Sequence, residues 1–276
     1  MEGLQRKSII ITGASGGMGS AATMEMARRG YRIIMACRNL EKAEAVRRRI
    51  LSEVPGALLQ IEELHLDSLS SVAGFAGRMK DEAPIDGLFN NAGVLPRRYS
   101  ETEDGYELTV GTNYIGPWLL SNLIIPLLGE NGSIVNMISI SAKAAALGRD
   151  FFCRGEKDFH QLRTYAETKL ALIFFSVALA QKKGVRVNMA DPGIVNTDMI
   201  RLGRWFDPLT DVFFRPFCNS PSRGARPAIN ALSSNGNMKI FSGNRQSDIP
   251  ESVLSRKDDI EWLWNETASR LEQYLR

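Results

Sequence analysis

The sequence predicts an α/β fold: a doubly wound parallel sheet of about seven strands with helices on both faces, built as one domain over residues 1–276. Short apolar runs rich in β-branched residues alternate with longer segments of helical pattern, and this alternation is typical of a parallel sheet joined by crossover helices. The chain has 276 residues, of which 44% are hydrophobic, so it can bury a core. Neither an internal repeat nor a low-complexity linker divides it.

Each element follows from its local pattern. Apolar runs of strand length predict strands at Ser8–Thr12, Arg32–Ala36, Leu58–Leu66, Gly87–Asn90, Ser133–Met137, Arg186–Ala190 and Met238–Phe241. Helical patterns predict helices at Gly17–Arg29, Leu40–Glu53, Leu69–Asp81, Asp104–Leu128, Leu162–Lys182, Ser222–Leu232 and Asp258–Leu275, the last as a C-terminal cover. Pro117 and Pro126 are expected to kink or end the long helix that contains them.

A glycine-rich turn joins the first strand to the first helix. The spacing is Thr12-Gly13-x-x-x-Gly17-x-Gly19. Strand, glycine turn and helix together form the first unit of a Rossmann-type dinucleotide-binding fold, in which the glycines let the backbone approach a pyrophosphate at the helix N-terminus. The alternative is a glycine-rich turn without a ligand.

A tyrosine and a lysine stand four residues apart, at Tyr165 and Lys169, where a long apolar helical run begins. On a helix both side chains leave the same face, one turn apart. A nearby cation favours the phenolate and is expected to lower the tyrosine pKa from about 10. Such a phenol is a suitable general acid for a carbonyl oxygen.

Six ordered motifs resemble those of the short-chain dehydrogenase/reductase family, in its single-domain branch. They are the glycine turn, Asn90-Asn91-Ala92-Gly93, Asn113, Ser139 after Ile134–Ile138, the Tyr165/Lys169 pair, and Pro192-Gly193-Ile194-Val195-Asn196-Thr197. Segments in the C-terminal part, at 215–217, 222–225 and 260–264, look like the retinol-dehydrogenase-like branch.

The resemblance implies four catalytic residues. Tyr165 would donate the proton in reduction, and Lys169 would lower its pKa and hold the nicotinamide ribose. Ser139 would hydrogen-bond the substrate oxygen, and Asn113 would support a water that connects Lys169 to solvent. Ser141 is the alternative to Ser139, which is preferred because it directly follows the strand.

The resemblance also implies a nicotinamide cofactor. NAD-using relatives place a carboxylate at the end of the second strand, where this chain has Cys37 followed by Arg38. A guanidinium can pair with a phosphate bidentately, so NADP(H) is expected and NAD(H) is the less favoured alternative. Arg38 could instead be a solvated surface residue without a role in binding. The expected cofactor-binding residues are Thr12, Gly13, Ser15, Gly17, Met18, Gly19, Arg38, Asp67, Asn90, Ala92, Gly93, Tyr165, Lys169, Pro192, Gly193, Val195 and Thr197. Asp67 could instead be an acid at a helix N-terminus, and Asn90 a turn residue.

The function implied by the resemblance is hydride transfer between NADP(H) and an apolar carbonyl compound or a primary or secondary alcohol, such as a retinoid, a steroid or an aldehyde. A non-catalytic dinucleotide-binding redox sensor of the same fold is the alternative, although the complete Ser-Tyr-Lys-Asn set argues against it. A sugar-nucleotide epimerase of the extended branch is disfavoured by the glycine spacing.

Two segments interrupt the alternation of strands and helices. Residues 140–161 separate Ser139 from Tyr165 and are expected to be an insertion. Residues 199–221 are rich in Phe, Trp, Pro and Arg and are expected to form a substrate lid. Irregular surface loops are the alternative for both.

Composition bounds the partners. A net charge of +3, from 34 basic and 31 acidic residues, gives no reason to expect nucleic acid. Three scattered cysteines indicate reduced thiols and a cytoplasmic protein, and two histidines make zinc improbable. His65 is expected to be a structural residue of the third strand. We expect no transmembrane segment and no signal peptide. The apolar run 170–176 would suit a homodimer or burial within the chain.

Overall fold

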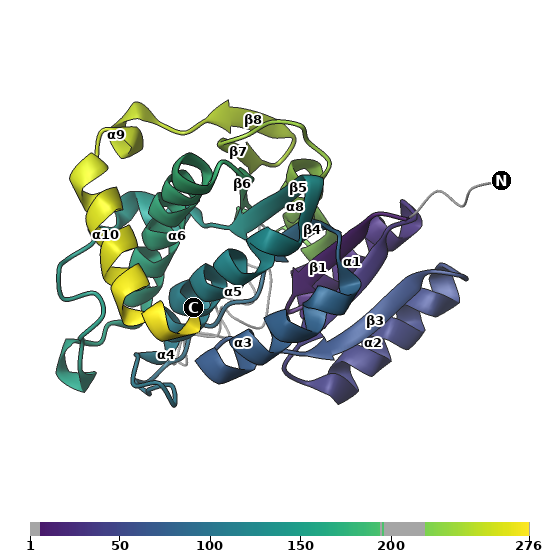
Figure 1. Ribbon diagram of the computed structural model, residues 1–276, viewed down its shortest axis with the longest axis horizontal. Helices are drawn as coiled ribbons and strands as arrows, with labels where there is room; N and C mark the ends of the chain where they lie inside the picture. Colours follow the sequence, from purple (N-terminus) through teal and green to yellow (C-terminus); the bar gives the residue numbers. More distant parts are fainter. Residues whose placement is uncertain (1–5, 194, 196–218, 276) are drawn as a thin grey trace.

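The computed structural model describes residues 6–193, 195 and 219–275, which form a twisted sheet with helices on both faces (Figure 1). In this part of the chain the sheet has eight strands in the order β3-β2-β1-β4-β5-β6-β7-β8. Neighbouring strands are parallel except for β7 and β8. The predicted fold class is confirmed. The eighth strand was not predicted, because Arg245–Asp248 is wholly polar and exposed and so carries no apolar run.

The strands are β1 (Ser8–Thr12), β2 (Arg32–Cys37), β3 (Leu58–Glu63), β4 (Ile85–Asn90), β5 (Leu128–Met137), β6 (Arg186–Asp191), β7 (Lys239–Ser242) and β8 (Arg245–Asp248). The α-helices are α1 (Gly17–Arg28), α2 (Leu40–Glu53), α3 (Leu69–Arg78), α4 (Leu108–Val110), α5 (Gly116–Ile124), α6 (Gln161–Lys183), α8 (Pro221–Leu232), α9 (Glu251–Leu254) and α10 (Lys257–Arg270).

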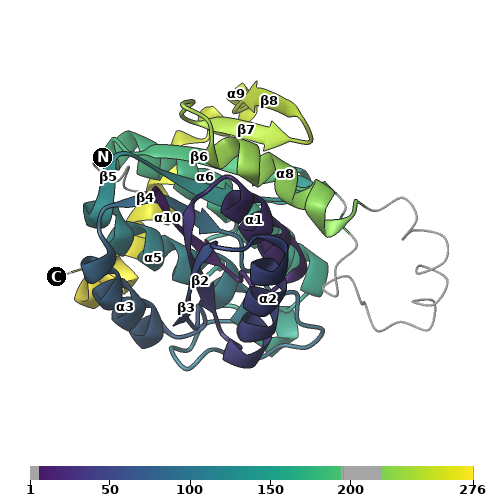
Figure 2. The same cartoon turned by 90° about the vertical axis from the view of Figure 1, so that its right-hand side faces the viewer.

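The two faces of the sheet bury separate apolar clusters. Ile9 and Ile11 of β1 face α1, α2 and α8, whereas Ile10 faces the layer of α3, α5 and α6 (Figure 2). Successive strand residues point to opposite faces, so a continuous apolar run such as β1 suits a strand covered on both sides. Packing of helices on both faces of the sheet fixes the positions of the carboxyl ends of the strands.

The segment predicted as one helix at 104–128 is divided. A π-helical turn, Gly111–Ile115, separates α4 from α5, and a 3-10 turn, Ile125–Leu127, precedes β5. Pro117 does not end the helix, since it lies in the first turn of α5. Pro126 lies in the closing 3-10 turn, so the helix ends there as expected.

Helix α10 covers the outer face of α6. Trp264 stacks on Phe175 with ring centroids 6.3 Å apart, and it lies 5.4 Å from Trp118. The apolar run 170–176 is buried in this cluster. Burial within the chain therefore accounts for the run, and a homodimer stays a prediction that these contacts do not require.

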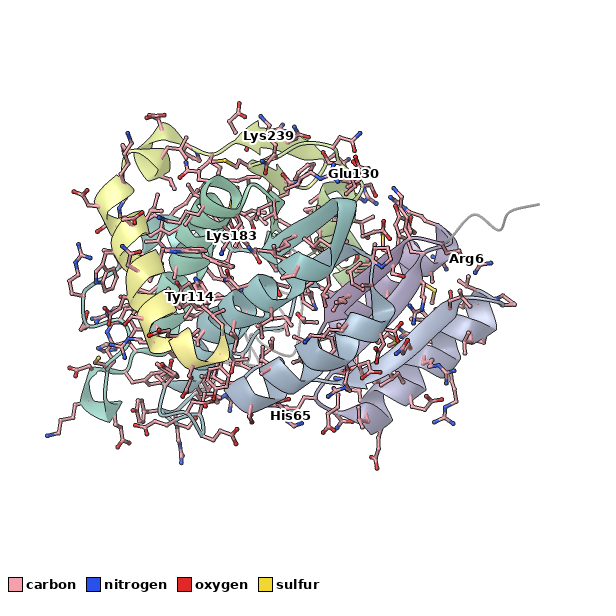
Figure 3. All side chains as sticks on the ribbon, viewed as in Figure 1. Arg6, His65, Tyr114, Glu130, Lys183 and Lys239 are labelled. Carbon is pink, nitrogen blue, oxygen red and sulfur yellow. The ribbon has the colours of Figure 1, made fainter. Side chains whose placement is uncertain are left out.

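Other expectations have definite outcomes. His65 follows β3 instead of lying in it, is partly exposed at the periphery (Figure 3), and has its Nε2 3.0 Å from Glu63 Oε1. That placement corrects the expected strand position. No helix among the described residues is long and apolar enough to cross a membrane. Residues 199–218 of the expected lid lie outside the described part, and Pro221 begins α8.

Candidate active site

A cavity of about 470 Å³ opens at the carboxyl ends of β1, β2 and β4. In open α/β sheets ligands bind at this edge. Of the residues expected to bind cofactor, its lining includes Thr12, Gly13, Ser15, Gly17, Met18, Gly19, Arg38, Asp67, Ala92 and Gly93. The cavity thus gathers residues from the glycine turn, from the end of β2 and from the segment after β4.

The glycine turn is shaped by close backbone approach. Gly13 has a φ of +63°, in the left-handed region that glycine adopts without penalty. A Cβ on Gly19 would lie 2.2 Å from the Gly13 carbonyl oxygen, so no larger residue fits without moving the backbone. Asn91 Nδ2 donates to Thr12 O at 2.8 Å and ties the turn to the end of β4.

The N-terminus of α1 is open toward the cavity. The helix begins after Gly16 with no side-chain cap and no acidic residue in its first turn. Free N–H groups and the helix dipole at such a terminus favour an anion. The Asn91 Oδ1 and Thr112 Oγ1 atoms, on residues that line the cavity, are buried without a hydrogen-bond partner in the described residues. These features fit a dinucleotide pyrophosphate with polar groups beside it.

Two cations stand at the end of the cavity beyond β2. Arg38 and Lys42 both line it, and Arg38 Nη1 lies 3.6 Å from Asp67 Oδ2. Asp67 is not the cap of α3, because Ser68 accepts from the Ser71 N–H instead. Cys37, in the position where NAD-users carry an acid, is buried beneath the glycine turn beside Ser15, and burial raises the pKa of its thiol.

Lys169 and Tyr165 lie together on α6, as the helical spacing predicts. Lys169 Nζ donates to Met137 O at 2.8 Å and lies 5.5 Å from the centre of the Tyr165 ring. Burial lowers the pKa of Lys169 to about 8. Burial also raises the pKa of Tyr165 to about 12, with a hydrogen bond to Ser139 opposing the shift and Asp191 adding to it. This is opposite to the lowered pKa that the sequence suggested, because burial of the phenol has the largest effect on it.

The two candidate serines differ in their contacts. The Ser139 side chain lies close enough to the Tyr165 hydroxyl to oppose the rise of its pKa. Ser141 points its own hydroxyl at Ser139, donating to Ser139 Oγ at 3.0 Å. Ser139 therefore stands beside the phenol, and Ser141 lies behind it as a support.

Asn113 contacts the segment after β4. Its Oδ1 accepts from the Val94 N–H at 2.7 Å, and its Nδ2 donates to Val94 O at 2.9 Å. A Cβ on Gly93 would lie 3.2 Å from Asn113 Oδ1 and 3.9 Å from Lys169 Nζ. Gly93 thus links the cavity to the candidate catalytic side chains Asn113 and Lys169, and the Asn113 amide holds the backbone there.

Some of the expected cofactor residues lie elsewhere. Asn90 is buried, and its Nδ2 donates to Ser121 Oγ at 2.9 Å and Asn136 Oδ1 at 2.8 Å, so its side chain faces the core. Pro192, Gly193 and Val195 follow β6 outside the cavity lining, while Thr197 lies outside the described residues. Val195 packs against Gly224 near Met18.

The cavity lining also includes residues that were not predicted: Gly16, Ala36, Asn39, Lys42, Leu64, Leu66, Asn91, Val94 and Thr112. Lys42 could have been inferred, since it lies in the first turn of α2, which begins two residues after Arg38 at the same strand end. Asn91 was within the quoted motif, but the sequence could not tell which of two adjacent asparagines points into the cavity.

Comparison with known proteins agrees with this geometry. The family model described as short chain dehydrogenase matches residues 7–204. The chain is 34% identical to human (Homo sapiens) retinol dehydrogenase 11 over 276 residues, covering 97% of this chain and 83% of that protein. It is 32% identical to mouse (Mus musculus) retinol dehydrogenase 13, covering 95% and 83%.

Solved structures show the same fold. A putative uncharacterized protein from Mycobacterium paratuberculosis superposes with a TM-score of 0.77 at 27% identity, covering 96% of this chain and 93% of that one. A short-chain dehydrogenase from Sphingobium yanoikuyae in complex with NADPH has a TM-score of 0.66 at 21% identity, covering 95% of both chains. With the dinucleotide cavity and the Ser139, Tyr165 and Lys169 side chains beside it, these matches establish that the chain belongs to the short-chain dehydrogenase/reductase family and resembles its retinol dehydrogenases.

Proposed function

We propose that the protein transfers hydride between NADP(H) and an apolar carbonyl compound or alcohol, with Asn113, Ser139, Tyr165 and Lys169 as its catalytic residues. The observation that carries the proposal is the convergence of the Ser139 and Tyr165 hydroxyls beside a buried Lys169, next to the dinucleotide cavity. A non-catalytic sensor would have no need of this arrangement.

The chain's own residues handle the proton. Tyr165 gives its hydroxyl proton to the carbonyl oxygen, while Ser139 hydrogen-bonds the same oxygen as negative charge develops on it. Lys169 brings positive charge close to the phenol and would hold the nicotinamide ribose. When bound, the nicotinamide supplies or accepts the hydride itself. In oxidation Tyr165 takes the proton back.

The raised Tyr165 pKa keeps the proposed proton donor protonated at neutral pH. A phenol with a pKa of about 12 stays protonated, so the proton donor is ready in almost every molecule. Oxidation needs the phenolate, which is scarce unless a further cation lowers that pKa.

The preference for NADP(H) is supported by two cations, Arg38 and Lys42, in the cavity lining near Asp67. Arg38→Asp should weaken NADPH binding about 10- to 100-fold, the worth of one or two charge-assisted hydrogen bonds, and NADH binding should change much less. Arg48→Asp is the matched control, since it makes the same charge change on an exposed residue of α2 outside the lining. Titration of both dinucleotides measures this. A parent protein that binds NADH more tightly contradicts the preference.

An apolar substrate is supported by exposed apolar side chains near Ser139 and Tyr165. Ile140 directly follows Ser139, and Leu162 lies on α6 about one turn before Tyr165. The exposed fractions of these two residues are 53% and 58%. Large exposed apolar side chains that gather next to a polar centre are typical of a binding surface for an apolar ligand. The retinol dehydrogenases to which the chain is similar point to the same class.

Reduced thiols support a cytoplasmic location, which we also propose. Cys153 is exposed and unpaired, and Cys37 is buried and unpaired. An exposed free thiol is more common in proteins of reducing compartments. Fractionation of cells that make the protein tests this.

Tyr165→Phe tests the mechanism. The substitution keeps the ring and removes only the hydroxyl, so folding and cofactor binding should survive. The rate should fall on the order of 10²- to 10⁴-fold, the usual contribution of a positioned general acid. Single-turnover oxidation of bound NADPH by a panel of ketones and aldehydes measures the rate. An unchanged rate with cofactor bound would mean that Tyr165 is not the acid, and absence of turnover in the parent would favour the sensor.

A further inference from the structure

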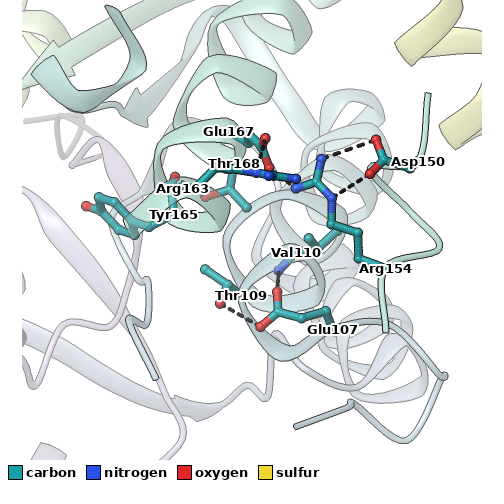
Figure 4. Close-up of polar contacts among 9 residues, drawn as sticks. All are labelled: Glu107, Thr109, Val110, Asp150, Arg154, Arg163, Tyr165, Glu167 and Thr168. Atoms are coloured by element: carbon teal, nitrogen blue, oxygen red, sulfur yellow. Dashed lines mark hydrogen bonds and ion pairs between the residues drawn. The ribbon is translucent and has the colours of Figure 1, made fainter. Parts of the chain in front are cut away.

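Three charged side chains form a cluster beside α6, which we name the Arg154 cluster: the buried Arg154 and Glu167 and the exposed Asp150 (Figure 4). Arg154 donates from Nε and Nη2 to the two carboxylate oxygens of Asp150, at 2.8 and 3.2 Å, and from Nη1 to Glu167 Oε2. The side chains of Arg154 and Glu167 are only 6% and 4% exposed.

Because Arg154 and Glu167 are buried, each needs the other as a charged partner. Burial alone would lower the pKa of Arg154, but the hydrogen bonds that Arg154 donates to Asp150 and Glu167 outweigh burial and raise this pKa. Arg154 therefore stays charged, and the loss of Arg154 or of its buried partner Glu167 would leave the other side chain without compensation. The fork of a guanidinium also fixes orientation, since it holds two carboxylates in defined directions.

The cluster joins the two parts of the chain that carry the catalytic hydroxyls. Arg154 belongs to the 140–161 segment, which leads from Ser139 to α6. Glu167 lies on α6 between Tyr165 and Lys169, and Figure 4 shows that Tyr165 and Glu167 leave the helix on different sides. Arg154 thus binds the first turns of α6 through Glu167, on a different side of the helix from the Tyr165 phenol.

The rest of the segment is fixed at a separate place. Phe151 and Phe152 are buried, with Phe151 5.5 Å from Tyr114 and Phe152 6.0 Å from Trp262 between ring centroids. The aromatic contacts hold the segment against the π turn and α10, and its first turn, Ile140–Ala144, packs on α6. The Arg154 cluster adds ion pairs that join a later part of the segment to α6. The packing of Phe151 and Phe152 contributes to the stability of the fold, whereas the ion pairs of Arg154 fix the orientation of the segment relative to α6.

We propose that Arg154 and Glu167 are positioning residues, which hold the first turns of α6 against the segment after Ser139 and so set the approach of the Tyr165 hydroxyl to the Ser139 hydroxyl. Neither side chain lines the dinucleotide cavity. The inference rests on the catalytic roles proposed above for Ser139 and Tyr165.

Arg163 provides a matched control. Its Nε lies 3.3 Å from Glu167 Oε1, so it contacts the same carboxylate, but it does so from within α6 and its side chain is 52% exposed. It cannot tie the helix to another segment. Exposed pairs of this kind contribute little, so Arg163→Met should leave the rate and the stability near those of the parent.

The first experiment measures hydride transfer in a single turnover with NADPH bound, for the parent, Arg154→Met and Arg163→Met. Arg154→Met should slow transfer on the order of 10- to 100-fold, the effect of a small displacement of a reacting group. NADPH affinity should stay that of the parent. A rate equal to that of Arg163→Met would overturn the proposal.

A double variant separates positioning from stability. Arg154→Met with Glu167→Leu removes both buried charges, while Asp150 and Arg163 are exposed enough to be solvated. Replacing a buried ion pair by apolar side chains is often neutral or stabilising, so the thermal midpoint should reach that of the parent even where a single variant folds poorly. The transfer rate should nevertheless stay low. Recovery of both the midpoint and the rate would show that the pair serves folding alone.

Failure of the mechanism and failure of this inference are distinguishable. If Tyr165→Phe is fully active, the proposed catalytic roles are wrong. If Tyr165→Phe is inactive while Arg154→Met and the double variant turn over like the parent, the roles stand and the positioning proposal is wrong.

Discussion

The dinucleotide cavity and the proposed catalytic pair, Tyr165 and Lys169, are neighbours, but they are built by different means. The glycine turn of the cavity is shaped by backbone atoms of a contiguous motif, where Gly19 leaves no room for a Cβ against Gly13 O. The proposed catalytic pair depends on contacts with a distant segment, since Lys169 donates to Met137 O and Tyr165 lies beside Ser139. Substitutions in the glycine turn are limited by the volume of the new side chain. Substitutions in the Tyr165–Lys169 region are limited by the charge and orientation of the side chains.

This difference teaches where each region is vulnerable. The close-packed backbone of the glycine turn tolerates almost no added atoms. Its packing does not depend on the charge of residues outside the turn. Buried hydroxyls and an ammonium tolerate changes of shape better than changes of hydrogen bonding. Three substitutions test these two kinds of sensitivity.

The largest effect is expected in the catalytic region, from Ser139→Ala. Removing a donor aimed at a developing oxyanion should lower the rate about 10²- to 10³-fold. Ser141→Ala is the matched change, and it should cost less than about tenfold, since it removes one neutral hydrogen bond to Ser139. Steady-state kinetics with one ketone distinguishes the two. Equal losses would show that either hydroxyl can serve the substrate.

A somewhat smaller effect is expected in the cavity, from Gly19→Ala. The added Cβ would lie 2.2 Å from a backbone oxygen, so we expect the free energy of unfolding to fall by about 3 kcal/mol, together with loss of dinucleotide binding. Gly77→Ala is the control, because its Cβ would meet nothing within 4 Å and alanine in a helix is favoured by about 0.5–1 kcal/mol. Urea denaturation and a dinucleotide titration measure both. If the Gly19→Ala variant is as stable as the parent, the contact between this position and Gly13 O does not limit the size of the residue at position 19.

The smallest effect is a gain in stability. The Lys169 pKa of about 8, against an ordinary 10.5, means that keeping the ammonium buried at pH 7 costs up to about 3 kcal/mol. Lys169→Met should therefore stabilise the fold while abolishing activity. Between pH 8 and 10.5 the unfolded parent binds more protons at this residue than the folded one, so parent stability rises with pH and the gain shrinks.

Urea denaturation of the parent and the Lys169→Met variant at pH 7 and pH 10 measures that gain. Tyr165 is present in both proteins, so its own titration largely cancels in the difference. A difference in stability that is the same at both pH values would mean that Lys169 is not held at a lowered pKa.

The contiguous parts of this molecule could be predicted from its sequence. The turn at Gly13–Gly19 and the spacing of Tyr165 and Lys169 are local patterns, and local patterns specify strand, turn and helix directly. The preference for Ser139 over Ser141 also followed from its place directly after β5, and the structure puts Ser139 beside the phenol.

Other features depend on information that local patterns do not contain. Strand residues alternate in direction, so a motif with Asn90 and Asn91 could not tell which one faces the cavity. The strand β8 is polar throughout and is held by pairing with β7. The direction of the Tyr165 pKa shift depends on burial, and the pairing of Arg154 with Glu167 joins two segments by a contact that no spacing encodes.

The π turn at Gly111–Ile115 makes the helix around Asn113 sensitive to length as well as to composition. A π turn holds one residue more than an α turn. Shortening it by one residue would let the helix close regularly, and each residue turns an α-helix by about 100°, so Asn113 would swing away from the Val94 backbone that it now holds. Insertions and deletions in this stretch therefore threaten the site more than most exchanges of one side chain for another.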